Sequence, residues 1–134
     1  MTILKIFLQF TLKLLVFSLV LAGLHYLVAS NMAMSFPVKE IFKIHIFIVA
    51  LTLLTYTLLV VVGKLDYTKI GLTFAGLVIV KMMVSFAYLY PILEPPVYDV
   101  KEVVFNFFAV YLLFLFFETR EAYILIQKGP FTPQ

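Results

Sequence analysis

The feature that most limits the possible folds of this chain is a series of long segments without charged residues. Residues 14–38 and 44–63 contain no Asp, Glu, Lys or Arg, and residues 70–93 contain only Lys81. A segment of about 20 apolar residues can cross a lipid bilayer as a helix. Because lipid offers no hydrogen-bond partners to the backbone, such segments must be helical. The sequence therefore predicts membrane-spanning helices.

The whole chain fits an all-α membrane protein, a four-transmembrane-helix antiparallel bundle in which residues 1–134 form a single domain. The expected helices cover about residues 6–29, 38–62, 68–90 and 99–120, followed by a C-terminal tail over residues 121–134. Only 13% of the residues are charged and the mean hydropathy is +1.12, whereas soluble domains carry about 25% charged residues. The chain has no cysteine, which excludes disulfides and thiolate metal sites.

Capping residues set the expected limits of the second helix and the start of the third. Pro37 suits the first turn of the second helix, and Gly63 suits its end. Asp66 or Thr68 can cap the next helix from a tight turn. A turn this short predicts that the second and third helices form an antiparallel hairpin.

A proline-rich loop is expected to separate the third helix from the fourth. Pro91, Pro95 and Pro96 should stop the third helix, because proline lacks the backbone N–H group that a helix needs. Asp99 followed by Glu102 has the spacing of a capping box, which predicts the start of the fourth helix.

The first apolar segment has two interpretations. Val28, Ala29 and Ser30 resemble the small-residue cleavage site of a signal peptide. We expect a retained helix instead, because the apolar run is long for a signal core and three further hydrophobic segments follow.

The distribution of basic residues predicts the orientation in the membrane. Six basic residues fall on the side that holds both termini and the 63–69 turn: Lys5, Lys13, Lys64, Lys69, Arg120 and Lys128. Three fall on the other side: Lys39, Lys43 and Lys101. The acidic residues lean the other way, with three on the first side and four on the second. By the positive-inside rule, both termini are expected in the cytoplasm.

Lys81 is the most informative polar residue, because a charge near the middle of a membrane helix normally faces a partner. At about 1.5 Å per residue, Lys81 is roughly level with Thr52 on the second helix. Helical spacing then extends an inward polar column along the bundle. Its main candidate residues, taken as a functional or docking column, are Lys81, Glu118, Tyr111, Asn106, Thr52 and Ser85. Lys81 is expected either to donate to Tyr111 and a threonine hydroxyl or to reach towards Glu118, about one helical turn nearer the cytoplasm.

This column has two interpretations. Lys81 and Glu118 could be the titrating groups of an ion or proton path, with the histidines at its outer mouth. Alternatively, the polar groups could simply hold the helices together, as Ser, Thr, Asn and His hydrogen bonds do in membranes.

Metal binding and catalysis have little support in the sequence. His25 and His45 fall at similar depth and are weak metal candidates, with Glu40 as the one obvious third ligand. No nucleophile–base pair, glycine-rich phosphate loop or intramembrane carboxylate pair is apparent. We therefore expect no enzyme activity, no metal and no cofactor, and no nucleic-acid partner.

The second half of the chain resembles a known group of proteins. The similarity lies in Lys81-Met82, the prolines after the third helix, Asn106-Phe107-Phe108, and the run from Phe114 to Glu118. These motifs are similar to those of small, uncharacterised four-helix Bacteroidetes membrane proteins, often encoded beside the ATP synthase genes near ATP synthase protein I. The resemblance implies an inner-membrane protein that helps to assemble or accompanies the ATP synthase membrane sector, with Lys81 docking onto a carboxylate there.

Two principal hypotheses of function follow. The first is a non-enzymatic accessory or assembly protein of a larger inner-membrane complex, with the ATP synthase membrane sector as the leading candidate and a partner protein or a homo-oligomer as its contact. Its contact face would be the Phe-rich fourth helix, with Phe105, Phe107, Phe108, Phe114, Phe116 and Phe117. The alternative is a small oligomeric ion or solute transporter or channel that uses the intramembrane Lys81. A purely structural membrane protein is a third possibility.

Overall fold

The computed structural model describes residues 2–33, 36–94 and 96–130. Its elements are α1 (Ile3–Ser30), α2 (Val38–Asp66), the short 3-10 helix η1 (Tyr67–Lys69), α3 (Ile70–Leu93) and α4 (Val100–Gln127). Within these residues there is no strand, so the all-α prediction is confirmed.

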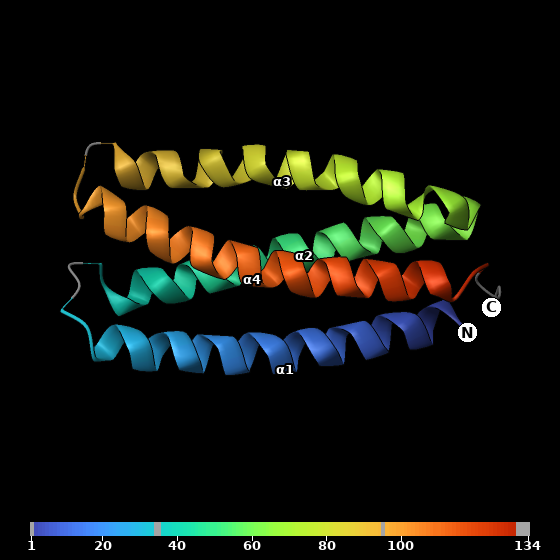
Figure 1. Ribbon diagram of the computed structural model, residues 1–134, viewed down its shortest axis with the longest axis horizontal. Helices are drawn as coiled ribbons and strands as arrows, with labels where there is room; N and C mark the ends of the chain where they lie inside the picture. Colours follow the sequence, from blue (N-terminus) through green and yellow to red (C-terminus); the bar gives the residue numbers. More distant parts are fainter. Residues whose placement is uncertain (1, 34–35, 95, 131–134) are drawn as a thin grey trace.

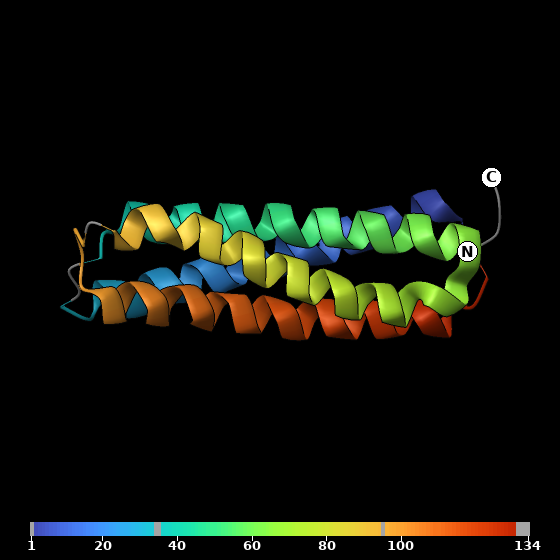
Figure 2. The same ribbon diagram turned by 90° about the horizontal axis from the view of Figure 1, so that it is seen from above.

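The helices run side by side along one long axis (Figures 1 and 2). α1 begins and α4 ends at the same end of the bundle, where η1 also joins α2 to α3 (Figure 1). The connections from α1 to α2 and from α3 to α4 lie at the other end. α2 packs against α1, α3 and α4, and α3 also packs against α4. α2 is therefore the central element of the bundle.

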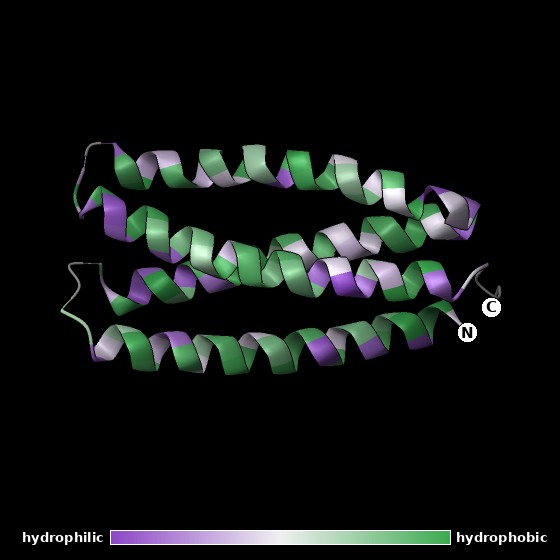
Figure 3. Ribbon diagram, viewed as in Figure 1, coloured by the Kyte–Doolittle hydropathy of each residue, from purple (hydrophilic) through white to green (hydrophobic). Residues whose placement is uncertain are grey.

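Three helical stretches are long and apolar enough to cross a membrane: Ile3–Ser30, Val38–Leu93 and Val100–Gln127. The second stretch turns back on itself at η1, since it contains both α2 and α3 (Figure 1). Apolar residues cover most of each helix (Figure 3), and many large apolar side chains are exposed on the outside of the bundle. These properties are compatible with a multi-pass membrane protein. The number of crossings stays a prediction.

The second helix ends later than the sequence predicts. Gly63 does not terminate α2 but lies buried inside it, and the helix continues to Asp66. There the Asp66 carboxylate accepts hydrogen bonds from the Thr68 backbone N–H at 3.1 Å and from the Thr68 hydroxyl at 2.6 Å. Asp66 is thus a capping residue as expected, but it caps η1 rather than α3.

The prediction that Pro91 stops the third helix is wrong. Pro91 lies inside α3, which continues to Leu93. Its missing N–H removes one bond in the last turn, while the backbone N–H of Glu94 still closes that turn on the Tyr90 carbonyl at 3.0 Å. Pro96 follows the helix, and Pro95 lies outside the described residues.

The fourth helix also exceeds its predicted limit, so the expected tail over residues 121–134 is too long. α4 continues to Gln127 because its last turns are packed, with Ala122 and Leu125 buried. Only residues from Lys128 onwards follow the helix, and residues 131–134 lie outside the described part. The predicted start is close to the observed one, since Asp99 is the N-cap of α4.

We predict that Asp99→Ala destabilises the protein by about 1 kcal/mol, because it removes an N-cap acceptor. The Asp99 carboxylate accepts from the backbone N–H groups of Lys101 at 2.9 Å and Glu102 at 3.3 Å. Thermal unfolding in detergent, followed by circular dichroism, measures the change. Asp99→Asn should keep most of the stability, since asparagine caps about as well. Glu94→Ala removes another exposed carboxylate at the same end and serves as control; an equal loss in that variant would contradict the capping role.

Candidate functional site

Lys81 of α3 and Glu118 of α4 form an ion pair in the interior of the bundle. The ammonium lies 2.5 Å from Glu118 Oε2, and the two side chains are only 4% and 3% exposed. At about 1.5 Å per residue, Lys81 is about 16 Å from the start of α3 and Glu118 about 14 Å from the end of α4. Both positions therefore lie well inside their helices, away from the ends. The pair joins α3 to α4 in the buried interior, where an isolated charge is costly.

The structure selects one of the two partners considered for Lys81. Among the residues that the structure describes, the ammonium donates to no hydroxyl: it lies over the ring of Tyr111, 5.6 Å from the ring centroid. The Thr52 hydroxyl donates instead to the Ile48 carbonyl of its own helix at 2.8 Å. The carboxylate is the better partner because it carries the opposite charge, which a buried ammonium needs in a low dielectric.

A second buried carboxylate, Glu121, is absent from the predicted site. It lies one turn after Glu118 on α4 and is 3% exposed. It pairs with Lys13 of α1 at 3.1 Å and with the adjacent Arg120 at 3.1 Å. Lys128 lies close to this cluster, and the pKa of Lys128 is lowered, first by burial and then by the charge of Lys13. The i, i+3 spacing of the two glutamates was the available signal, since such residues share a helix face.

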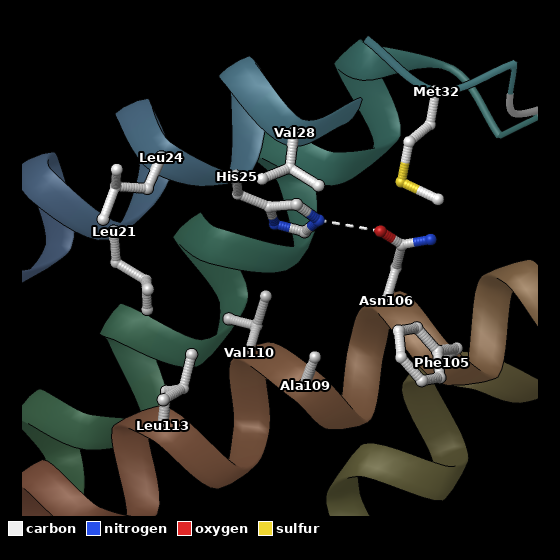
Figure 4. Close-up of a pocket in the computed structure, with 10 residues that line it drawn as sticks. All are labelled: Leu21, Leu24, His25, Val28, Met32, Phe105, Asn106, Ala109, Val110 and Leu113. Carbon is white, nitrogen blue, oxygen red and sulfur yellow. Dashed lines mark hydrogen bonds between the residues drawn. The ribbon is translucent and has the colours of Figure 1, made fainter. Parts of the chain in front are cut away.

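The two histidines meet at the other end of the bundle, together with Asn106. His25 Nδ1 lies 2.9 Å from His45 Nε2, and His25 Nε2 lies 2.7 Å from Asn106 Oδ1 (Figure 4). The Asn106 amide nitrogen donates to the Glu102 carbonyl at 2.7 Å. One hydrogen-bonded chain thus ties α1, α2 and α4 together.

This arrangement does not resemble a metal site. Among the described residues, no group of three or more His, Cys, Asp or Glu side chains could hold a metal ion. Glu40, the suggested third ligand, instead accepts from Lys43 at 3.2 Å. Each histidine already uses a ring nitrogen in the bond between them.

The predicted column is only partly a connected network. Four buried side-chain atoms find no hydrogen-bond partner among the described residues: His45 Nδ1, Ser85 Oγ, Tyr111 Oη and Glu118 Oε1. They come from α2, α3 and α4 and lie between the two polar ends of the bundle. A buried polar atom without a partner costs about 1–3 kcal/mol. These atoms therefore belong to a polar interior whose bonds are incomplete within the chain itself.

A groove runs between α1 and α4 on the outside of the bundle. One part has a volume of about 340 Å³, with His25 and Asn106 among otherwise apolar walls (Figure 4). A second part of about 760 Å³ extends towards Lys13 and Arg120. Leu113 lines both parts, so the groove follows much of the length of the two helices.

No protein-family model matches the chain, and neither does any curated protein or solved structure. The resemblance of the second half to Bacteroidetes membrane proteins therefore stays a prediction. Any function must be argued from the geometry of the chain.

We predict that Lys81→Met destabilises the protein by about 3–5 kcal/mol, because it leaves the Glu118 charge buried without its partner. The double variant Lys81→Met/Glu118→Met should recover most of this loss, since both charges are then gone. Unfolding in detergent of the wild type, Lys81→Met, Glu118→Met and the double variant gives the four free energies of a double-mutant cycle.

The exposed pair Lys43–Glu40 is the matched control for this cycle. Its ammonium and carboxylate lie 3.2 Å apart, but Lys43 is 59% exposed. Exposed pairs contribute about 0–1 kcal/mol, so Lys43→Met should change little. Additive effects of the Lys81 and Glu118 substitutions would show that the buried pair is not a coupled unit.

Proposed function

We propose that this protein is a non-enzymatic accessory or assembly protein of a larger membrane complex. The observation that carries the proposal is the groove between α1 and α4, which leaves one long apolar surface of the bundle without a helix. A transmembrane helix of a partner protein is the occupant whose length and apolar surface fit this groove.

Two aromatic side chains mark the α4 side of the groove. Phe105 and Phe116 line its two parts and are 77% and 75% exposed. They are 11 residues apart, close to three helical turns, and so share one stripe of α4. Phe107 and Phe114 are fully buried and belong to the core instead. The contact face is therefore narrower than the whole Phe-rich helix.

The role of Lys81 changes in this proposal. A docking lysine must reach a carboxylate of the partner, but Lys81 is buried and already paired with Glu118. We assign it to the interior, where it holds α3 against α4. The partner surface then consists of α1 and α4, with apolar contacts and close packing rather than a salt bridge.

The partner that we propose is the membrane sector of ATP synthase, on the ground of the sequence resemblance in the second half of the chain. The proposed location is the bacterial inner membrane, with four crossings and both termini in the cytoplasm. This orientation is supported by an excess of basic residues at one end of the bundle, where α1 begins and η1 lies.

The four crossings predict opposite labelling of the two ends of the bundle. The chain has no cysteine, so single cysteines report without background. In spheroplasts, Val97→Cys should react with an impermeant maleimide, whereas Leu65→Cys should react only after lysis. Both side chains are strongly exposed, at 71% and 82%. Ile79→Cys, within α3, should stay unlabelled, and reaction of positions 65 and 97 from the same side would exclude this topology.

Co-purification tests the accessory function directly. Extraction from native membranes in mild detergent, followed by mass spectrometry, should recover ATP synthase membrane subunits at stoichiometric yield. Recovery of the protein alone or as a homo-oligomer would refute an accessory role.

Filling the groove provides a site-specific version of this experiment. Leu113→Trp places a large ring in the groove at a half-exposed position and should abolish most of the co-purification. Leu72→Trp makes the same change on α3, where Leu72 is 80% exposed, and should leave the complex intact. Equal effects of the two variants would show that the partner does not bind between α1 and α4.

A further inference from the structure

The interior of the bundle carries a second set of observations that the accessory role does not use. His45 Nδ1, Ser85 Oγ, Tyr111 Oη and Glu118 Oε1 are all buried without a hydrogen-bond partner among the described residues. They extend from the ion pair towards the histidine pair, on the three helices that pack around the core. Buried polar atoms of this kind are usually satisfied by internal water.

The bonds of the histidine pair fix which nitrogen carries each proton. Asn106 donates its amide N–H to the Glu102 carbonyl, so its Oδ1 faces His25 and must accept. His25 Nε2 is then the donor, and a neutral His25 must accept at Nδ1 from His45 Nε2. It follows that His45 Nδ1 has a free lone pair directed into the buried interior.

We propose that the bundle conducts protons along its interior, between Glu118 at one end of the path and His25 at the other. Water molecules at the unpartnered hydroxyls of Ser85 and Tyr111 would bridge the gap between Glu118 and His45. All the groups needed for proton transfer then come from this one chain, with no oligomeric lumen.

Access from the end that holds the start of α1 is provided by Glu121. Its partner Lys13 is 42% exposed, so this carboxylate lies at the boundary between interior and surroundings. The next carboxylate towards the interior is Glu118, which lies one turn of α4 away from Glu121. A proton can pass from one carboxylate to the other through one bridging water. Lys81 holds Glu118 Oε2, which leaves Glu118 Oε1 as the oxygen that faces the path.

The transfer at the histidine pair balances without any electron transfer. A proton binds His45 Nδ1, and His45 passes its Nε2 proton to His25 Nδ1. His25 then releases its own Nε2 proton at the loop end of the groove, where its partner Asn106 also lines a neighbouring hollow with the charged residues Lys101 and Glu102. One proton enters and one leaves, and proton exchange with the bridging water molecules returns each ring to its starting tautomer.

The same geometry favours a proton over a metal cation. A sodium ion needs several oxygen ligands at one point, but the Glu118 carboxylate is already neutralised by Lys81. The three unpartnered oxygens belong to α3 and α4 and lie at successive depths rather than in one cluster. Hydronium and water can move along such a row, because each proton needs only the next acceptor.

Reconstituted liposomes test the proposal. The full chain is inserted into vesicles that contain a pH-sensitive dye, and an imposed pH difference drives flux. Wild-type vesicles should lose the pH difference faster than empty vesicles. Glu118→Gln and His45→Gln should reduce the rate to that of empty vesicles, because an amide cannot carry the proton. Thr119→Val, on the exposed face of α4, is the matched control and should keep the wild-type rate.

His45→Gln decides the outcome if Glu118→Gln fails to fold, since glutamine can still donate to His25. Wild-type vesicles no faster than empty ones, or a wild-type rate in His45→Gln, would overturn the proposal. Solid-state nitrogen NMR of labelled histidine gives an independent check: His45 Nδ1 should be unprotonated and Nε2 protonated. The opposite tautomer would also overturn it. Co-purification with a partner is unaffected by these results, so the two proposals can fail separately.

Discussion

The buried ion pair between Lys81 and Glu118 is the interaction on which the arrangement of this bundle depends. In a low dielectric, neither charge is tolerable without the other, so α3 and α4 must face each other at this level. That requirement fixes the rotation of both helices about their axes. Once α4 is fixed, Glu121 points towards α1, where Lys13 meets it. A single pair thus orders three helices.

Much of the fold could be predicted from the sequence, because a long segment without charged residues predicts a helix long enough to cross a membrane. Asp99 could be predicted as the N-cap of α4, because capping depends on the residue type and its immediate neighbours in sequence. The ends of α2 and α4 could not, because buried contacts such as those of Ala122 and Leu125 extend a helix beyond its local stop signals. Pro91 shows the converse, since one missing bond does not end a helix within two residues of its terminus.

The sequence predicts how far along the bundle each residue of the candidate site lies, but not the direction in which its side chain points. Counting residues from each turn placed Lys81 and Glu118 close enough to meet, and His25 level with His45. The contacts around them depend on the rotation and tilt of each helix. Counting residues does not determine either quantity. Residue counting therefore did not predict that Asn106 contacts His25 or that Glu121 is buried. It also did not predict that the Thr52 hydroxyl donates to a carbonyl of its own helix.

The position of α1 links the groove to the interior. α1 packs mainly on α2, and its polar contacts with α4 lie towards the two ends, at Lys13–Glu121 and His25–Asn106. Between them, Phe17 stacks on Phe117 at a centroid distance of 4.8 Å. A helix bound in the groove would lie along this line and cover the His25 side chain, which lines the groove. Occupation of the groove would therefore close the outer end of the proton path, so that binding and conduction act on the same two helices.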